Sequence, residues 1–265
     1  MSKEFFKNKN YLVTGSSGGI GAGIAKALAK EGANVGIHYN KRYEGAIETQ
    51  KALEIFSVKT ALYQADFTSI EETKKLIESF IADFGSIDGL ISNAGLVFKG
   101  SIEDADESYW ESVMQVNLRA PYILSRACLP HLKETKGVIV HTSSIHAQHQ
   151  TEYLSAYASS KAGLESLMKS QALEWAKYGI RVNAIAPGVV PVERTEEYFS
   201  QPKNQELWLP HVPLNRLGKV EDLAEMLLFL CSDKASWITG QSFTVDGGLV
   251  ARSNYPKRDE PVLLK

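Results

Sequence analysis

A glycine-rich loop between a short apolar strand and an amphipathic helix constrains the fold of this chain more than any other stretch. The strand is predicted over residues 11–14, and the loop that follows reads Gly15-Ser16-Ser17-Gly18-Gly19-Ile20-Gly21. A helical pattern then begins with Ile20, Ile24 and Leu28 on one face. Glycines let the backbone approach a pyrophosphate, and the first helical turn offers unpaired N–H groups. This order predicts a dinucleotide site, with a merely tight turn as the alternative.

Short apolar segments alternate with helical patterns along the rest of the chain. Further buried strands are predicted near residues 34–39, 60–63, 89–92, 138–140, 181–186 and 243–245. The alternation predicts a single Rossmann-like α/β domain, with a doubly wound parallel sheet flanked by helices. A chain of 265 residues, of which 44% are hydrophobic, can bury one large core. We place this domain at residues 1–250 and a polar C-terminal tail at residues 251–265.

Composition narrows the possible partners. The formal net charge is −2, so no broad basic field indicates nucleic acid, and no cationic helix indicates a membrane surface. No apolar run reaches the roughly 18 residues of a membrane span, and the first residues lack the hydrophobic core of a signal peptide. We therefore expect a cytoplasmic protein that binds small molecules. The two cysteines, Cys128 and Cys231, lie in apolar helical patterns, which favours buried free thiols.

The end of the second predicted strand bears on the choice of cofactor. An acidic residue at this edge would hydrogen-bond the adenosine ribose of NAD and repel the 2′-phosphate of NADP. Here Tyr39 stands at that position, and Asn40, Lys41 and Arg42 follow it. The basic pair can make charge-assisted bonds to a phosphate, although it can also be simply solvated. We predict NADP(H) as the preferred cofactor and NAD(H) as the alternative.

Two more strand ends carry candidate cofactor contacts. Asp66-Phe67 ends the third strand, where the carboxylate can accept a bond from an adenine amino group or instead start the next helix. Ser69 and Glu72 offer a capping box for that helix, which leaves Asp66 available for a ligand. Asn93-Ala94-Gly95 ends the fourth strand, and its small residues allow a nucleotide to lie against the backbone, as a plain turn would also require.

A tyrosine and a lysine four residues apart are the candidate catalytic pair. On a helix Tyr157 and Lys161 lie one above the other. Unit charges about 4 Å apart interact by roughly 4 kcal/mol at an effective dielectric of about 20, which corresponds to about three pKa units. We therefore expect Lys161 to bring the pKa of Tyr157 close to neutral, as a general acid/base requires. Ser144 lies at the C-terminal end of a buried strand, where open α/β sheets bind ligands. A solvated Tyr–Lys pair is the plainer alternative.

A polar residue interrupts an apolar helix earlier in the chain. The helix is predicted from Ser108 to about Leu132 and carries Asn117 among apolar neighbours. A buried amide must form hydrogen bonds, so Asn117 is either a structural residue or a site residue.

Together these motifs resemble the short-chain dehydrogenase/reductase family. The matching pieces follow the order and approximate spacing of that family from residue 11 to residue 248, and they are Thr14 to Gly21, Asp66, Asn93-Ala94-Gly95, Asn117, Ser144, Tyr157 with Lys161, Pro187-Gly188, and Thr244-Val245-Asp246-Gly247-Gly248. The resemblance implies a seven-stranded parallel sheet, a nicotinamide cofactor and a homotetramer.

The resemblance also implies roles for individual residues. Asn117, Ser144, Tyr157 and Lys161 would form the catalytic tetrad. In it Tyr157 is the acid/base, Ser144 holds the substrate oxygen, Lys161 lowers the tyrosine pKa and binds the nicotinamide ribose, and Asn117 holds a proton-relay water through its backbone. The cofactor contacts it implies, together with those proposed above, are Gly15, Ser17, Gly19, Ile20, Gly21, Tyr39, Asn40, Lys41, Arg42, Asp66, Phe67, Asn93, Ala94, Gly95, Tyr157, Lys161, Pro187, Gly188 and Val190.

The chain departs from the family pattern at three positions. Val192 stands where relatives often have a threonine that bonds the nicotinamide carboxamide, which leaves the backbone N–H of Val190 for that contact. Gly18 stands where NADP-preferring members frequently carry a basic residue, and Ser92 replaces an asparagine before the Asn-Ala-Gly turn.

Two segments are candidates for substrate binding. Residues 145–156 contain His146, His149 and several other polar side chains, which suits a sugar, polyol or sugar acid unless these side chains point to solvent. Residues 188–218 lack apolar periodicity and are predicted to form a long substrate loop, with Trp208 and His211 facing the ligand.

We therefore predict an NAD(P)-dependent dehydrogenase/reductase that acts on CH–OH groups of a polar substrate. No metal is expected, because His141 lies within a strand and His146 beyond it, so the imidazoles should not converge. The enzymatic alternative is a 3-oxoacyl-carrier-protein reductase, for which Arg119, Arg126 and Lys133 would form the basic docking patch. The non-enzyme alternative is an NADP-sensing regulator, which would need no Tyr–Lys pair.

Overall fold

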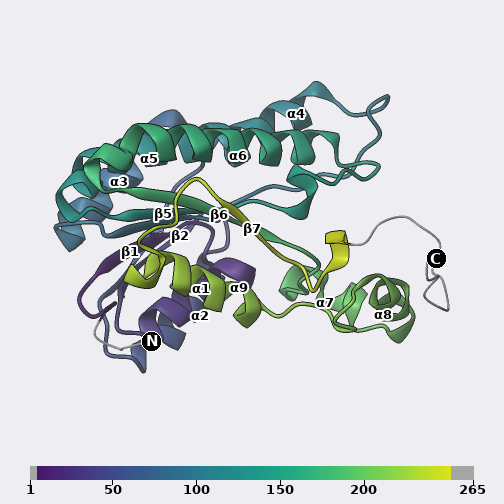
Figure 1. The fold of residues 1–265 in the computed structure, drawn as a ribbon, viewed down its shortest axis with the longest axis horizontal. Helices are drawn as coiled ribbons and strands as arrows, with labels where there is room; N and C mark the ends of the chain where they lie inside the picture. Colours follow the sequence, from purple (N-terminus) through teal and green to yellow (C-terminus); the bar gives the residue numbers. More distant parts are fainter. Residues whose placement is uncertain (1–4, 252–265) are drawn as a thin grey trace, which may run out of the picture.

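Seven parallel strands form the central sheet of the computed structural model, which describes residues 5–251 (Figure 1). Their order across the sheet is β3-β2-β1-β4-β5-β6-β7, which confirms the predicted Rossmann-like fold. The strands are β1 (Asn10–Val13), β2 (Asn34–Tyr39), β3 (Thr60–Gln64), β4 (Gly89–Ser92), β5 (Val138–Thr142), β6 (Arg181–Pro187) and β7 (Ser242–Val245).

Helices cover both faces of the sheet (Figure 1). One layer contains α1 (Gly19–Lys30), α2 (Tyr43–Glu54) and α9 (Val220–Cys231). The opposite layer contains α3 (Ile70–Phe84), α5 (Ala120–Thr135) and α6 (Ser155–Trp175). Three shorter helices, α4 (Glu107–Met114), α7 (Glu193–Phe199) and α8 (Pro202–Trp208), lie toward one end of the molecule.

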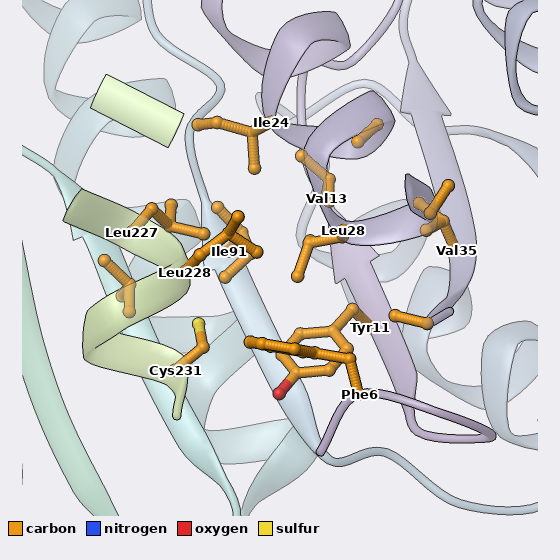
Figure 2. Close-up of a cluster of buried hydrophobic side chains, with 14 of the residues drawn as sticks. Phe6, Tyr11, Val13, Ile24, Leu28, Val35, Ile91, Leu227, Leu228 and Cys231 are labelled. Atoms are coloured by element: carbon orange, nitrogen blue, oxygen red, sulfur yellow. The ribbon is translucent and has the colours of Figure 1, made fainter. Parts of the chain in front are cut away.

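The two layers receive alternate side chains of each strand. In β1, Tyr11 and Val13 pack toward α1 and α9, whereas Leu12 packs on the opposite face. Figure 2 shows Tyr11 and Val13 with Ile24 and Leu28 of α1. The central strands β1, β4 and β5 are buried on both faces, so they read as mostly apolar runs rather than as alternating patterns.

The sheet reverses its winding direction between β1 and β4. From β1 the chain continues to β2 and β3 on one side, whereas β4 begins the other half of the sheet. The loops that leave the C-terminal ends of β1 and β4 therefore separate toward opposite faces and leave a crevice between them. The glycine-rich loop follows β1 at this crevice, and α1 starts at its end, at Gly19.

Two predicted elements differ from the structure. The helix predicted from Ser108 to Leu132 is divided, because a π-helical turn at Gln115–Arg119 separates α4 from α5. The substrate loop predicted at residues 188–218 contains α7, α8 and a 3₁₀ turn at Leu209–His211. These helices bury at most one residue each, so they have no apolar stripe that would reveal them in the sequence.

The predicted C-terminal tail falls on residues 252–265, apart from Ala251, and so lies outside the described residues. The domain boundary at residue 250 stays a prediction. No helix in the described part of the chain has the length and apolar character needed to cross a membrane.

Candidate active site

A cavity of about 650 Å³ opens in the crevice between β1 and β4. The loops after β1, β2, β3 and β4 form its walls, together with the start of α7. The predicted cofactor residues that line it are Gly15, Ser17, Gly19, Ile20, Gly21, Tyr39, Asn40, Lys41, Arg42, Asp66, Phe67, Asn93, Ala94 and Gly95. The other predicted cofactor residues, Tyr157, Lys161, Pro187, Gly188 and Val190, do not line this cavity, whereas Val192, Glu193 and Arg194 do.

The glycine-rich loop is packed too closely for side chains. A Cβ atom on Gly21 would lie 2.3 Å from the carbonyl oxygen of Gly15, and one on Gly15 would lie 2.8 Å from Cα of Ala94. Gly15 also has φ +63°, a backbone conformation that other residues rarely adopt. The loop therefore presents bare backbone to the cavity at the N-terminus of α1, which fits the pyrophosphate of a dinucleotide.

Glu193, at the start of α7, shows that this backbone binds an anion. The N–H of Gly19 donates a hydrogen bond of 2.8 Å to Oε2 of Glu193. The carboxylate stands where the positive end of α1 favours negative charge. The two residues lie 174 positions apart in the chain, so no local pattern of the sequence indicates this contact.

His38 of β2 is a second residue that sequence analysis missed. It is buried, and its Nδ1 accepts a hydrogen bond of 2.9 Å from the N–H of Gly15, while Nε2 lies 3.1 Å from the carbonyl oxygen of Ala65. Its ring stacks on Phe67, with 4.2 Å between the ring centroids. These contacts require a neutral ring that is protonated on Nε2. Burial lowers the pKa of His38 to about 4, which keeps that form near neutral pH.

Arg42 lies against the glycine loop. A Cβ atom on Gly18 would stand 2.7 Å from Nη1 of Arg42, so the guanidinium occupies the space that a side chain at position 18 would fill. Lys41 lines the same part of the cavity. Arg42, the residue before α2, thus places a basic group next to Gly18, which has no side chain of its own.

Asp66 is tied into a local turn at the cavity wall. Its Oδ1 accepts hydrogen bonds of 2.8 Å from the N–H and the hydroxyl of Thr68, and these bonds lower its pKa. Ser69 caps α3 as predicted, but the carboxylate of Glu72 binds the N–H of Asp66 instead of completing a capping box on Ser69. Asp66 is therefore less free than predicted, although it still lines the cavity.

The π-helical turn holds Asn117 behind the cavity. The Asn117 side chain is fully buried, accepts a bond of 2.8 Å from the N–H of Leu96, and donates to the Leu96 carbonyl and the Ser160 hydroxyl. A Cβ atom on Gly95 would lie 3.4 Å from Oδ1 of Asn117 and 3.6 Å from Nζ of Lys161. The Asn117 side chain therefore makes structural hydrogen bonds, the first of the two predicted alternatives, and it lies near Lys161.

Ser144, Tyr157 and Lys161 come together where β5 meets α6. Ser144 follows the last residue of β5 by two positions, and its hydroxyl is close enough to Tyr157 to lower the pKa of the phenol. Lys161 is buried, and its Nζ donates a bond of 2.7 Å to the carbonyl oxygen of Thr142. With Asn117 behind it, this cluster supplies two hydroxyl groups and an ammonium for proton transfer.

The expected effect of Lys161 on the tyrosine is absent in this structure. Burial raises the pKa of Tyr157 above its usual value, while the hydrogen bond with Ser144 and the positive charge of Arg194 lower it only in part. Nζ of Lys161 lies 5.7 Å from the centre of the Tyr157 ring and is turned to Thr142. Burial also lowers the pKa of Lys161 to about 8, so its charge is itself weakened.

The predicted substrate residues are dispersed. The ring of His146 lies edge-on to Tyr157, with 6.3 Å between the centroids, and its Nδ1 contacts the carbonyl oxygen of His149. The side chain of His149 is exposed. Trp208 packs on Phe199, and neither Trp208 nor His211 lines the cavity. Ser144 and His146 are thus the predicted substrate residues that lie beside Tyr157.

His141 and His146, which we expected not to converge on a metal, contact different residues. His141 is buried in β5 and bonds Gln171, whereas His146 faces Tyr157. Within residues 5–251, no group of three or more His, Cys, Asp and Glu side chains is placed to hold a metal ion.

Comparisons with known proteins cover almost the whole chain. A family model described as enoyl-(acyl carrier protein) reductase matches residues 15–250. The chain is 37% identical over 245 residues to 3beta-hydroxysteroid dehydrogenase 1 of Eggerthella lenta, covering 92% of this chain and 94% of that protein. It is 36% identical over 242 residues to a 3-oxoacyl-acyl-carrier-protein reductase of Staphylococcus aureus, covering 91% and 98%.

A solved structure is similar over the same extent. An Agrobacterium tumefaciens protein, provisionally assigned as a 2-deoxy-D-gluconate 3-dehydrogenase and solved with bound NADP, has a TM-score of 0.84 and 30% identity to this chain. The match covers 94% of this chain and 98% of that one.

The neutral ring of His38 predicts a pH dependence of stability. The pKa of His38 is about 4 in the folded chain and about 6.5 in an unfolded one, so the unfolded state binds more protons between these values. The free energy of unfolding should therefore fall as pH drops from 6.5 to 4, by up to about 1.4 kcal/mol per pH unit for this group. The free energy of unfolding, measured with urea at several pH values in this range, should change with pH less steeply in His38→Gln, by that amount. His211→Gln, at an exposed position, should keep the full slope, and an unchanged slope in His38→Gln would contradict the assignment.

The contact between Glu193 and Gly19 predicts competition with the cofactor. Removal of the carboxylate in Glu193→Gln should tighten NADPH binding about two- to fivefold, the effect expected of an exposed charge. Titration of NADPH fluorescence measures the Kd directly. Glu197→Gln removes the same charge from an exposed position of α7 that does not line the cavity, and its Kd should equal that of the unchanged protein. Equal or weaker binding by Glu193→Gln would show that the carboxylate does not compete.

Proposed function

Since this chain belongs to the short-chain dehydrogenase/reductase family, and is thus a dehydrogenase/reductase of CH–OH and carbonyl groups, we propose that it transfers hydride between NADP(H) and a polar substrate, a sugar, polyol or sugar acid. The observation that carries the proposal is the cluster of Ser144, Tyr157 and Lys161 at the end of β5, where Lys161 lies beside Gly95 in the wall of the cavity that the glycine loop also lines. A homotetramer and a cytoplasmic location stay predictions.

The glycine loop and the residues opposite it would hold the cofactor. The N–H of Gly19 and its neighbours at the start of α1 would bind the pyrophosphate, as the bond to Glu193 supports. Asn93 fixes this loop, because its amide donates to the carbonyl oxygens of Thr14 and Gly15. When bound, the nicotinamide supplies or accepts the hydride.

Tyr157 and Ser144 would handle the charge on the substrate oxygen. A phenol with a raised pKa keeps its proton near neutral pH, which suits its donation to a carbonyl oxygen as hydride arrives. The Ser144 hydroxyl would be the second donor to the same atom. Lys161, with a pKa of about 8, can return a proton to this cluster near neutral pH.

The preference for NADP(H) is supported by Arg42. Positions 39 and 40 hold Tyr and Asn, so no acidic side chain there would repel a 2′-phosphate. Lys41 and Arg42 both line the cavity. The guanidinium already lies against Gly18, in the place where a 2′-phosphate can be bound by two parallel N–H groups.

The polar substrate is supported by the groups around Tyr157. The His146 ring lies beside it, and the charge of Arg194 is close enough to lower its pKa. A cation and an imidazole at this point favour a hydroxylated, anionic compound such as a sugar acid. The rest of the polar run contributes less than predicted, because Gln148 is bound to Glu165 and Gln150 to the carbonyl oxygen of His146.

The 3-oxoacyl-carrier-protein reductase remains the second candidate, favoured by the 36% identity to the Staphylococcus aureus reductase. A carrier protein is acidic and would need free cations near the site. Arg119 donates a bond of 2.6 Å to the carbonyl oxygen of Thr68, and Lys133 lies 4.1 Å from the ring centre of Tyr178. Two of the three predicted docking cations are thus engaged with neighbours, which leaves Arg126, at an exposed position, for a carrier protein and favours the small polar substrate.

The first test concerns the cofactor. Arg42→Ala should lower kcat/KM for NADPH by about 10- to 100-fold, the effect of losing one or two charge-assisted bonds, and should leave that for NADH within about twofold. Lys51→Ala removes an exposed cation of α2 and serves as the control. An equal loss for both cofactors would contradict the role of Arg42, and a wild-type preference for NAD(H) would overturn the cofactor proposal.

The second test concerns the substrate and the chemistry. Absorbance at 340 nm should be followed with NADP(H) or NAD(H) and a panel of D-glucose, sorbitol, D-gluconate, 5-keto-D-gluconate and acetoacetyl-CoA. We expect turnover with a sugar acid or polyol, whereas turnover with the thioester alone would favour the second candidate. Tyr157→Phe should bind NADPH normally and lose about two to four orders of magnitude in kcat. Full turnover by this variant would remove the proposed acid/base.

A further inference from the structure

The helix face that carries Tyr157 and Lys161 continues with Glu165. The three residues are spaced four apart in α6, so their side chains lie in one row along the helix. Lys161 and Glu165 are 3% and 6% exposed. A buried carboxylate is costly unless several donors bind it, so its presence one turn beyond the catalytic pair needs an explanation.

The row matches three consecutive residues at the end of β5. The hydroxyl of Ser144 lies beside Tyr157, and the carbonyl oxygen of Thr142 accepts from Nζ of Lys161. Between them, the hydroxyl of Ser143 donates a bond of 2.8 Å to Oε1 of Glu165. Each residue from Thr142 to Ser144 therefore lies against a different side chain of α6, and the first two are held by hydrogen bonds.

Glu165 has two further donors. The hydroxyl of Ser242, in β7, donates a bond of 2.6 Å to Oε1, and the amide of Gln148 donates a bond of 3.1 Å to Oε2. Gln148 belongs to the segment that leaves Ser144 and includes His146. The Glu165 carboxylate thus links Ser143, directly before Ser144, to Gln148 in the segment after Ser144.

We propose that Glu165 is a positioning residue, which holds Ser143 and Gln148 so that Ser144 and His146 stay aligned with Tyr157. The Glu165 carboxylate is buried and bound by Ser143, Ser242 and Gln148, so it acts through these residues and not by contact with the cofactor. The inference rests on the proposed function, because it presupposes that Ser144 and Tyr157 handle the substrate oxygen. A purely structural role would instead lie in the bond to Ser242, which ties β7 to α6.

The variants separate these two roles. Glu165→Leu removes all three bonds, Ser143→Ala removes only the bond on the catalytic side, and Ser242→Ala removes only the bond to β7. Glu165→Gln keeps an oxygen for the serine hydroxyls and tests rescue by a conservative change. Glu174→Leu makes the same substitution as Glu165→Leu at an exposed position of α6.

Each full-length variant is assayed for thermal unfolding, for the Kd of NADPH, and for kcat and KM with the panel compound that the unchanged protein converts fastest. With cofactor deuterated at C4, the same assay reports whether hydride transfer limits turnover. A misplaced oxygen donor is expected to lower kcat by about 30- to 100-fold in Glu165→Leu and by about 10-fold in Ser143→Ala. In both variants the isotope effect rises and the Kd of NADPH stays unchanged. Glu165→Gln and Glu174→Leu stay within about threefold of the unchanged protein, and Ser242→Ala lowers the unfolding temperature but keeps kcat.

The proposal is overturned if Ser143→Ala keeps full kcat, or if Ser242→Ala loses as much kcat as Ser143→Ala. Ser143→Ala is a small change, so it gives this answer even where Glu165→Leu fails to fold. Tyr157→Phe is assayed in parallel. If Tyr157→Phe is inactive while the Glu165 and Ser143 variants are fully active, only the positioning role fails, whereas an active Tyr157→Phe means that the proposed function itself fails.

Discussion

The junction between the ends of β1 and β4 is the constraint on which the rest of the site depends. Thr14, directly after β1, accepts hydrogen bonds of 2.9 Å and 3.0 Å from the N–H groups of Asn93 and Ala94, and its hydroxyl lies 3.3 Å from the carbonyl oxygen of Ile91. This bridge fixes the two loops at the point where the sheet reverses its winding. Gly15 fits there only because it lacks a side chain. The glycine loop is thus placed before any ligand arrives, which is what pre-organised binding requires.

The features that sequence analysis predicted well are local. Buried strands, the glycine loop and the four-residue spacing of Tyr157 and Lys161 each follow from residues close together in the chain. The features it missed join distant segments: His38 to Gly15, and Glu193 to Gly19. No periodicity reports such contacts. The same reason explains the hidden helices α7 and α8, which bury too little to leave a pattern.

The one electrostatic prediction that failed did so for a physical reason. The prediction took a separation of about 4 Å and an effective dielectric of about 20 for Tyr157 and Lys161, but the helix places both where desolvation disfavours charge. Burial acts on the two groups in opposite directions, since it raises the pKa of a phenol and lowers that of an ammonium. The two pKa values, which are nearly equal in the free groups, therefore move apart, so that the Lys161 ammonium becomes the stronger acid and the Tyr157 phenol keeps its proton near neutral pH.

The start of α7 acts on both halves of the site with opposite charges. Glu193 binds the backbone N–H of Gly19, whereas the positive charge of the next residue, Arg194, lowers the pKa of Tyr157. Val192 lies between the two regions, with Cβ 3.5 Å from where a side chain of Gly19 would begin. A threonine at this position would offer a hydroxyl to the cofactor, and valine offers none. In this chain the charged side chains after Val192, those of Glu193 and Arg194, therefore make the polar contacts of the segment. A movement of this turn changes the contact with Gly19 and the charge near Tyr157 together.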